Sequence, residues 1–185
     1  MNKIRPAKPQ DIVQIRHICI ETADESLRKN ETAKRITALL FAQYYIEHET
    51  KNCFVLEADG KVVGYILCST DIKRFSKAYR SDIFKEVASL SILWGVACLF
   101  IPLKYVLLQK KYPAHLHIDI LKDYQSSGYG SELMQTLFAH LKKQKIKGLC
   151  LSCSAKNEKA LRFYRKFGFA PLLKAFGGVM MGIKF

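Results

Sequence analysis

Apolar residues recur along the chain first at helical spacing and later at strand spacing, which predicts an α/β fold. Pro9 suits the first turn of a helix that reaches about Ala23. The stretch at 31–48 predicts a second helix, whose inward face would carry Ile36, Leu39, Leu40, Phe41 and Tyr44. Short runs rich in apolar and alternating residues predict strands at 3–5, 52–58, 61–69, 114–121, 147–153, 169–174 and 179–185. Further helices are expected at 128–145 and 157–167.

Glycine pairs predict how these elements are joined. Asp59-Gly60 favours a tight hairpin between the strands at 52–58 and 61–69, and Gly177-Gly178 does the same for the last two strands. Gly168 would close the helix at 157–167. Residues 74–112 look helical and apolar, and they are longer than a simple connection requires. No linker, repeat or low-complexity tract interrupts the pattern, so we expect a single domain over residues 1–185.

Composition agrees with one domain that has a substantial core, since 49% of the 185 residues are apolar and 11% are aromatic. The formal charge is +14, from 30 basic and 16 acidic residues. This balance favours acidic partners such as nucleic acid, anionic lipid or a polyphosphate cofactor. The basic residues are dispersed and form no nucleic-acid motif. We therefore expect a solvated basic surface, part of which serves a polyanionic ligand, and no nucleic-acid partner.

The six cysteines lie mostly in apolar runs and are expected to be small core residues. Cys150 and Cys153 have the spacing of a redox or metal pair, but residues three apart on a strand point to opposite faces. The pair should neither chelate nor form a bridge. The first residues, Met-Asn-Lys-Ile-Arg-Pro, do not resemble a signal peptide, which predicts a cytoplasmic protein.

The stretch at 87–103 is uncharged and reaches the lower length limit of a membrane span. Ser89, Ser91, Gly95 and Pro102 interrupt it, and lysines flank both ends. A buried or interfacial helix fits this pattern better than a span. Contact of residues 87–103 with a membrane surface or a partner is the alternative that stays open.

A glycine turn lies between the strand at 114–121 and the helix at 128–145, whose inward face carries Leu133, Leu137, Phe138 and Leu141. The turn reads Gln125-Ser-Ser-Gly128-Tyr-Gly130. The first turn of a helix has free N–H groups and a partial positive charge, and glycine allows a phosphate to approach the backbone. The turn is therefore a candidate anion site, although such turns are common.

A second motif further along the chain supports a functional interpretation of this turn. The segment 157–169 reads Asn157-x-x-Ala160-x-x-Phe163-Tyr164-x-Lys166-x-Gly168-Phe169. Together with Gln125-x-x-Gly128-x-Gly130, it resembles the GNAT superfamily of acyl-CoA-dependent N-acetyltransferases. The opening Ile4-Arg5-Pro6-Ala7 with Asp11 also resembles that family's first strand and helix. The resemblance covers most of the chain, with a gap at 71–112.

The resemblance implies a GNAT-like mixed, mostly antiparallel sheet of about seven strands flanked by helices. The sheet would splay open between the strands at 114–121 and 147–153, where CoA inserts. It also implies direct transfer of an acetyl group from acetyl-CoA to the primary amine of an unidentified acceptor, without a metal, by a monomer or homodimer. The segment 74–112 would form a lid on the acceptor side. A non-catalytic CoA-binding or sensing module is the alternative function, and a membrane-surface or nucleic-acid-associated protein is a third.

The same resemblance supplies candidate cofactor contacts. These are Ile120, Leu121, Gln125, Ser126, Ser127, Gly128, Tyr129, Gly130, Ser131, Asn157, Ala160, Phe163 and Lys166. The backbone of Ile120 and Leu121 would pair with pantetheine like an added strand. Lys122 departs from the family, where proline is common, and the two serines at 126–127 replace charged residues or glycine. Asn157 could equally be a helix cap, Lys166 a solvated lysine and Phe163 a core residue.

Candidate catalytic residues come from two places. Tyr164 matches the family's tyrosine beside the CoA sulfur, and a phenol with a pKa of about 10 is a credible proton donor to a thiolate. His115, His117 and Asp119 share one face of the strand at 114–121. Asp119 or His117 could be the base for the acceptor amine, with His115 further out. A metal-binding facial triad and a purely structural polar cluster are the alternatives.

The segment 112–121 has a narrower resemblance, to the acetyltransferase-like domain of protein O-GlcNAc hydrolases and its stand-alone bacterial relatives. Asp119 matches an aspartate that has been regarded as catalytic in that group. The match spans about ten residues, so it suggests a subfamily and says little about the acceptor.

Overall fold

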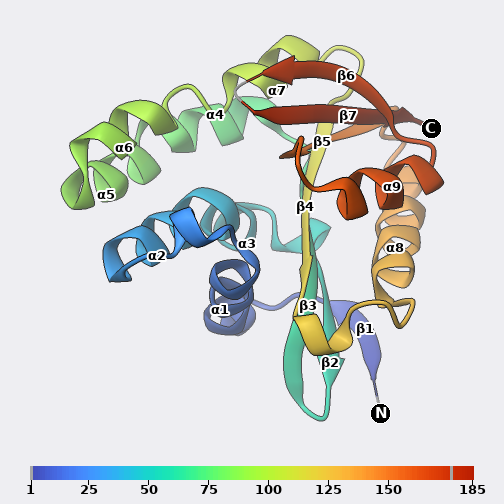
Figure 1. Cartoon of the computed structure of the whole chain (residues 1–185). Helices are drawn as coiled ribbons and strands as arrows, with labels where there is room; N and C mark the ends of the chain where they lie inside the picture. The colour runs from blue at the N-terminus through green and yellow to red at the C-terminus, as the bar shows by residue number, and fades with distance from the viewer. Residues whose placement is uncertain (1, 176) are drawn as a thin grey trace.

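The computed structural model, which describes residues 2–175 and 177–185, contains a seven-stranded sheet with helices on both faces (Figure 1). The strands are β1 (Lys3–Pro6), β2 (Phe54–Ala58), β3 (Lys61–Ser69), β4 (Ala114–Ile120), β5 (Gly148–Ser154), β6 (Ala170–Ala175) and β7 (Gly178–Lys184). Their order in the sheet is β1-β2-β3-β4-β5-β7-β6, and every pair is antiparallel except β4 with β5. The predicted fold class is confirmed.

Helices divide between the two faces of the sheet (Figure 1). One face carries α1 (Ile12–Thr22), α2 (Glu31–Ala38), α3 (Tyr44–His48), α4 (Ile72–Arg80), α5 (Asp82–Leu90), α6 (Ile92–Cys98) and α7 (Leu103–Leu108); the other carries α8 (Tyr129–Lys143) and α9 (Glu158–Lys166). Each face has its own hydrophobic core. Ile15, Tyr65 and Phe75 belong to the first, and Leu133, Leu137 and Leu149 belong to the second.

Local signals placed most of these elements correctly. The helix expected at 31–48 is one helical stretch in which a π-helical turn, Leu39–Gln43, separates α2 from α3. Asp59 and Gly60 both have positive φ, +48° and +77°, as a tight hairpin requires. The segment expected to be helical at 74–112 forms α4 to α7. Cys150 and Cys153 join different cores, so they lie on opposite faces of β5 as predicted.

The two central strands pair over a very short distance. Parallel pairing of β4 with β5 is confined to Ala114 with Leu149 and His115 with Cys150, and beyond these residues the strands diverge. The predicted splay of the sheet is therefore confirmed. Because the divergence begins at the third residue of β4, most of that strand has a free edge on the side that faces β5.

A buried carboxylate fixes the end of β3 to the helices beside it. Glu49, which is only 3% exposed, accepts hydrogen bonds from the hydroxyl of Tyr44 at 2.7 Å and from Ser69 Oγ at 2.5 Å. It also accepts bonds from Asn52 Nδ2 at 3.1 Å and from the Thr70 N–H at 2.7 Å. These donors come from α3, the turn before β2 and the end of β3, so one side chain connects three segments.

We expect Glu49→Gln to lower the free energy of unfolding by about 1.5–3 kcal/mol, because the amide replaces an acceptor oxygen with a donor that faces other donors. Urea denaturation followed by circular dichroism measures the change. Glu86→Gln, on the exposed surface of α5, is the matched control and should change stability by less than about 0.5 kcal/mol. Equal effects of the two substitutions would contradict a structural role for the Glu49 network.

Candidate active site

A cleft of about 660 Å³ opens where β4 and β5 diverge. Most of the site residues predicted from the sequence line it: His117, Asp119, Ile120, Gln125, Ser126, Gly128, Gly130, Ser131, Asn157, Ala160, Phe163, Tyr164 and Lys166. They come from β4, the turn that leads into α8, and α9. One concave surface therefore brings together the candidate anion site and the candidate catalytic groups.

Three of the predicted cofactor residues are not among the residues that line the cleft: Leu121, Ser127 and Tyr129. The N–H of Leu121 donates to the Val63 carbonyl at 2.9 Å, and its carbonyl accepts from the Tyr124 N–H at 2.9 Å. The Tyr129 hydroxyl accepts a bond from Asn2 Nδ2 at 2.6 Å. Because the backbone of Leu121 is already engaged, Ile118, which does line the cleft, is the better partner for Ile120 at the free edge of β4.

The turn before α8 has the backbone shape of an anion site. Gly128 is the N-cap and has φ +89°, and Ser126 has φ +64°. A Cβ built at Gly128 would meet no atom within 4 Å, so this glycine serves backbone conformation and leaves open space above the helix start. Gln125 Nε2 donates to the Ile120 carbonyl at 2.8 Å, which ties the turn to the end of β4.

Two lysines of α9 bring positive charge to the cleft. Lys166 was expected there from the sequence, whereas Lys159 was not. Lys159 Nζ donates to Gln125 Oε1 at 3.0 Å and so sits beside the turn. Asn157 lines the cleft and also caps α9, because its Oδ1 accepts from the Ala160 N–H at 3.0 Å. The alternative interpretation of Asn157 as a helix cap is therefore confirmed, and a contact with cofactor stays a prediction.

On the polar face of β4, Tyr65, Asp119 and His117 form a chain of polar contacts. The Tyr65 hydroxyl donates to Asp119 Oδ2 at 2.5 Å, and His117 Nε2 lies 3.3 Å from the same oxygen. His117 Nδ1 lies 3.0 Å from the Phe41 carbonyl, so Nδ1 carries a hydrogen. Burial raises the pKa of Asp119, partly offset by His117 and by the Tyr65 hydrogen bond.

His115 does not belong to this chain, and its predicted places in an acceptor pocket and in a facial triad are wrong. Its ring is completely buried, stacks on Tyr105 with centroids 4.1 Å apart, and contacts Phe75 at 4.4 Å. Burial lowers its pKa to about 3, so the imidazole is neutral. The helices α4 and α7 supply these aromatic rings, and nothing in the strand pattern reveals that they cover this position.

Cys19, which the sequence analysis assigned to the core, lies next to His117 and Asp119. The Sγ of Cys19 and ligand atoms of His117 and Asp119 all lie within 4.8 Å of one another, close enough to share a metal ion. The expectation that the site needs no metal stays a prediction. Burial, followed by the charge of Asp119, raises the Cys19 pKa to about 12, and burial also raises that of Cys153. Both cleft thiols are therefore protonated near neutral pH.

Tyr164, on α9, also lines the cleft. Its side chain is 8% exposed and belongs to the core beneath α8 and α9. Burial, and secondly the charge of Asp119, raise its pKa well above the ordinary phenol value. The hydroxyl therefore stays protonated throughout the physiological range. Tyr164 is more deeply buried than the half-buried aromatic that was the alternative, and its role as proton donor to the thiolate stays a prediction.

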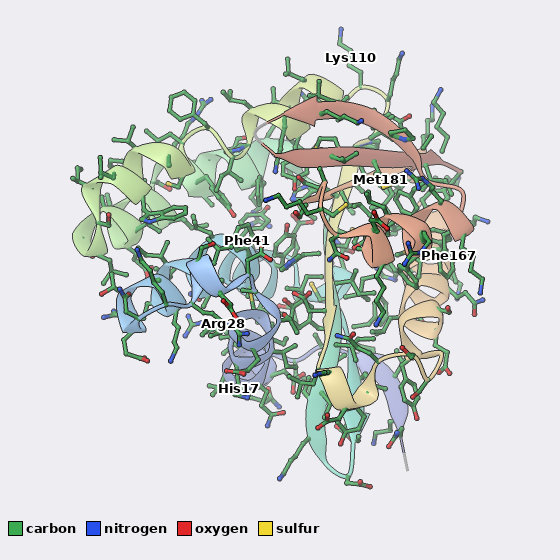
Figure 2. All side chains as sticks on the ribbon, in the orientation of Figure 1. His17, Arg28, Phe41, Lys110, Phe167 and Met181 are labelled. Atoms are coloured by element: carbon green, nitrogen blue, oxygen red, sulfur yellow. The ribbon has the colours of Figure 1, made fainter. Side chains whose placement is uncertain are left out.

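The remaining wall comes from the N-terminal helices, which sequence reasoning missed. Thr22, Asp24, Leu27, Thr37 and Phe41 line it. Figure 2 shows Phe41 and Phe167 on opposite sides of β4, one on the helices at residues 31–48 and the other at the end of α9. Within the described part of the chain, no residue between 72 and 112 lines the cleft, so a lid made by that segment stays a prediction.

Comparison with known proteins agrees with this architecture. Residues 16–169 match the acetyltransferase (GNAT) family. Among solved structures, SsHAT is 29% identical and superposes with a TM-score of 0.86, covering 99% of this chain and 98% of its own. PH1933 from Pyrococcus horikoshii is 18% identical with a TM-score of 0.67, covering 100% and 99%. PaiA N-acetyltransferase from Thermoplasma acidophilum, solved in complex with coenzyme A, is 14% identical with a TM-score of 0.63, covering 100% and 99%. Because the family match spans most of the sequence, the chain belongs to the GNAT family of acetyltransferases.

Proposed function

We propose that this protein is an N-acetyltransferase that moves an acetyl group from acetyl-CoA to a primary amine by direct attack. The observation that carries the proposal is the single cleft in which the glycine turn at the start of α8 leads to Tyr164 and Asp119. A protein with the same fold, PaiA from T. acidophilum, was solved with coenzyme A, which supports CoA as the carrier here.

The cleft offers each part of acetyl-CoA a suitable environment. The N–H groups at the start of α8, with Lys159 and Lys166, suit the diphosphate, because the helix end and the lysines are both positive. The backbone edge of β4 that is left unpaired at Ile118, and the N–H of Ile120, whose carbonyl already accepts from Gln125, suit the amides of pantetheine. Ser152, Cys153 and Ser154 form the opposite wall on β5. This path directs the thioester toward Tyr164.

Transfer then requires two proton movements. The acceptor arrives as an ammonium ion and must lose a proton before its nitrogen attacks the thioester carbonyl carbon. Asp119, paired with His117, is the base we assign to that proton. As the carbon–sulfur bond breaks, the Tyr164 hydroxyl supplies a proton to the leaving thiolate. Because Cys19 and Cys153 are protonated, an acetyl-cysteine intermediate is disfavoured, which supports direct attack.

The acceptor end favours a cationic molecule. Asp24 and Asp119 both line the cleft although the whole chain has a formal charge of +14. Carboxylates in a basic protein attract an ammonium group to this end and phosphates to the other. A non-catalytic CoA-sensing module is the alternative, but such a module has no need of a base and an acid in the same cleft.

Acetyl-CoA is expected to raise the melting temperature, because a ligand that binds only the folded state stabilises it by about 2.7 kcal/mol at 100 times its dissociation constant. Differential scanning fluorimetry measures the shift. Gly128→Asp should abolish it, since a carboxylate would occupy the phosphate position. Gly60→Asp is the matched control, because Gly60 also has positive φ with open space around it but lies in a remote hairpin. No shift in the unsubstituted protein at millimolar acetyl-CoA would count against the proposal.

Tyr164→Phe should preserve acetyl-CoA affinity while slowing acetyl transfer by roughly 10²-fold or more, the usual worth of a positioned acid. The phenyl packing survives and the proton donor is lost. Single-turnover quenched flow is the appropriate measurement, because slow product release would hide the effect in the steady state. A wild-type rate constant in that experiment would reduce Tyr164 to a packing residue.

Asp119→Asn should lower acceptor turnover and change the pH–rate profile without weakening acetyl-CoA binding. The base form of Asp119 is lost as the pH falls through its raised pKa. The acid limb of kcat/KM for the acceptor should therefore lie above the ordinary carboxyl range in the wild type and disappear in the variant. Stopped-flow detection of the released thiol across pH gives the profile. An unchanged acid limb in the variant would assign the base to another group.

A further inference from the structure

The helices α6 and α7 carry an unusual concentration of exposed apolar side chains. Of the ten large apolar residues that are exposed in the described part of the chain, seven lie between 92 and 107: Ile92, Leu93, Trp94, Val96, Phe100, Leu103 and Leu107. Leu93 is 80% exposed and Leu107 is 77% exposed. Single exposed apolar residues need no explanation, but a group of this size on one segment indicates a binding surface.

Packing of α6 against α5 leaves the apolar side chains on the other side of α6 in solvent. Gly95 is buried against α5, where an added Cβ would lie 2.7 Å from Ala88 Cβ. Cys98 is fully buried on the same inner side of α6. Because the inner side of α6 is already occupied by α5, rotating the helix would not bury Leu93. Figure 1 shows α5 and α6 at one edge of the molecule, away from β5, α8 and α9.

Positive charge accompanies the apolar surface. Residues 72–112 contain eight basic and two acidic side chains. Lys73, Lys77 and Arg80 lie on one side of α4 and line a groove of about 470 Å³ together with Val106 and Gln109 of α7. Figure 2 shows the Lys110 side chain pointing outward beyond the end of α7. Cations therefore flank the segment that bears Leu103 and Leu107.

We propose that residues 72–112 dock this protein onto an anionic lipid surface, with the apolar side chains of α6 and α7 in the interface and the α4 cations against the head groups. Apolar side chains beside lysine and arginine are the composition of interfacial helices. No described helix is both long and apolar enough to cross a bilayer. The proposal goes beyond acetyl transfer and does not depend on it.

A second copy of the chain is a poorer occupant of the same surface. A twofold contact brings the same patch of two copies together, so two segments that each carry eight basic and two acidic side chains would be pressed against one another. Repulsion of like charges opposes that contact, and an anionic surface removes it. The charge of the patch therefore favours lipid over self-association.

Trp94 offers a direct test, because it is the chain's single tryptophan and lies within the patch, 40% exposed. We expect its fluorescence to shift to shorter wavelength with vesicles of phosphatidylcholine and phosphatidylserine, and the protein to sediment with them. Vesicles of phosphatidylcholine alone should bind at least tenfold more weakly, and added salt should weaken binding to the mixed vesicles. Absence of both shift and sedimentation with mixed vesicles would overturn the proposal.

Matched variants distinguish vesicle binding through this patch from nonspecific adsorption of the protein to lipid. The double change Leu93→Ser with Phe100→Ser should reduce vesicle binding at least tenfold, whereas Val13→Ser, at a residue 70% exposed on α1, should not. Lys73→Glu with Lys77→Glu should also weaken binding, whereas Lys61→Glu in the β2–β3 hairpin should not. The far-ultraviolet circular dichroism spectrum and the melting temperature should stay close to those of the unsubstituted protein in all variants, which shows that each one folds.

Two outcomes would contradict lipid docking through this patch. Equal losses in the patch variants and their controls would show that binding is not specific to residues 72–112. A shift in Trp94 fluorescence that depends on protein concentration alone, with a dimer in analytical ultracentrifugation that Leu93→Ser with Phe100→Ser dissociates, would overturn the lipid proposal in favour of a second copy.

Discussion

The early end of pairing between β4 and β5 is the constraint on which the rest of the site depends. Only two residue pairs join the strands, and a free strand edge leaves backbone groups without partners. The cleft exists because no further strand fills that gap, and the start of α8 and the wall of α9 are placed around it. A sheet that continued its pairing would be more regular and would have nowhere to hold a long cofactor.

Charge is distributed unevenly along this cleft. Lys159 donates to Gln125 beside the turn that leads into α8, and Lys166 also lines the cleft, while Asp24 and Asp119 contribute carboxyl groups to it. The polar chain from Tyr65 to His117 holds Asp119 in place, and burial keeps its pKa raised. A base with a raised pKa accepts a proton more readily than an exposed aspartate. The same burial that makes the carboxyl costly to ionise therefore makes it useful.

The segment 72–112 has two sides with different environments. Its inner side completes the first core, where Phe75 and Tyr105 enclose the neutral ring of His115. Its outer side leaves Leu93 and Leu107 in solvent. The same segment therefore both packs against the core, through Phe75 and Tyr105, and exposes apolar side chains such as Leu93 and Leu107. The outer surface could therefore change without altering the cleft, which no residue between 72 and 112 in the described part of the chain lines.

The sequence by itself determined the local features of this protein. Period-two alternation identified β4, the glycine turn located the start of α8, and Asn157 and Gly168 marked the ends of α9, because each depends on neighbours within a few residues. The resemblance of the two motifs to GNAT enzymes supplied the splay between β4 and β5, which periodicity alone does not contain.

Only the tertiary structure decided what covers each face. Alternation placed His115, His117 and Asp119 on one side of β4, but it did not say that α4 and α7 would bury the first while the other two would line the cleft. The sequence likewise did not reveal that Cys19 and Asp24 line the cleft, or that Glu49 forms a buried hydrogen-bond network. Their partners are distant in sequence, and which distant segment meets a given face is set by packing of the whole chain, which a periodic pattern does not encode.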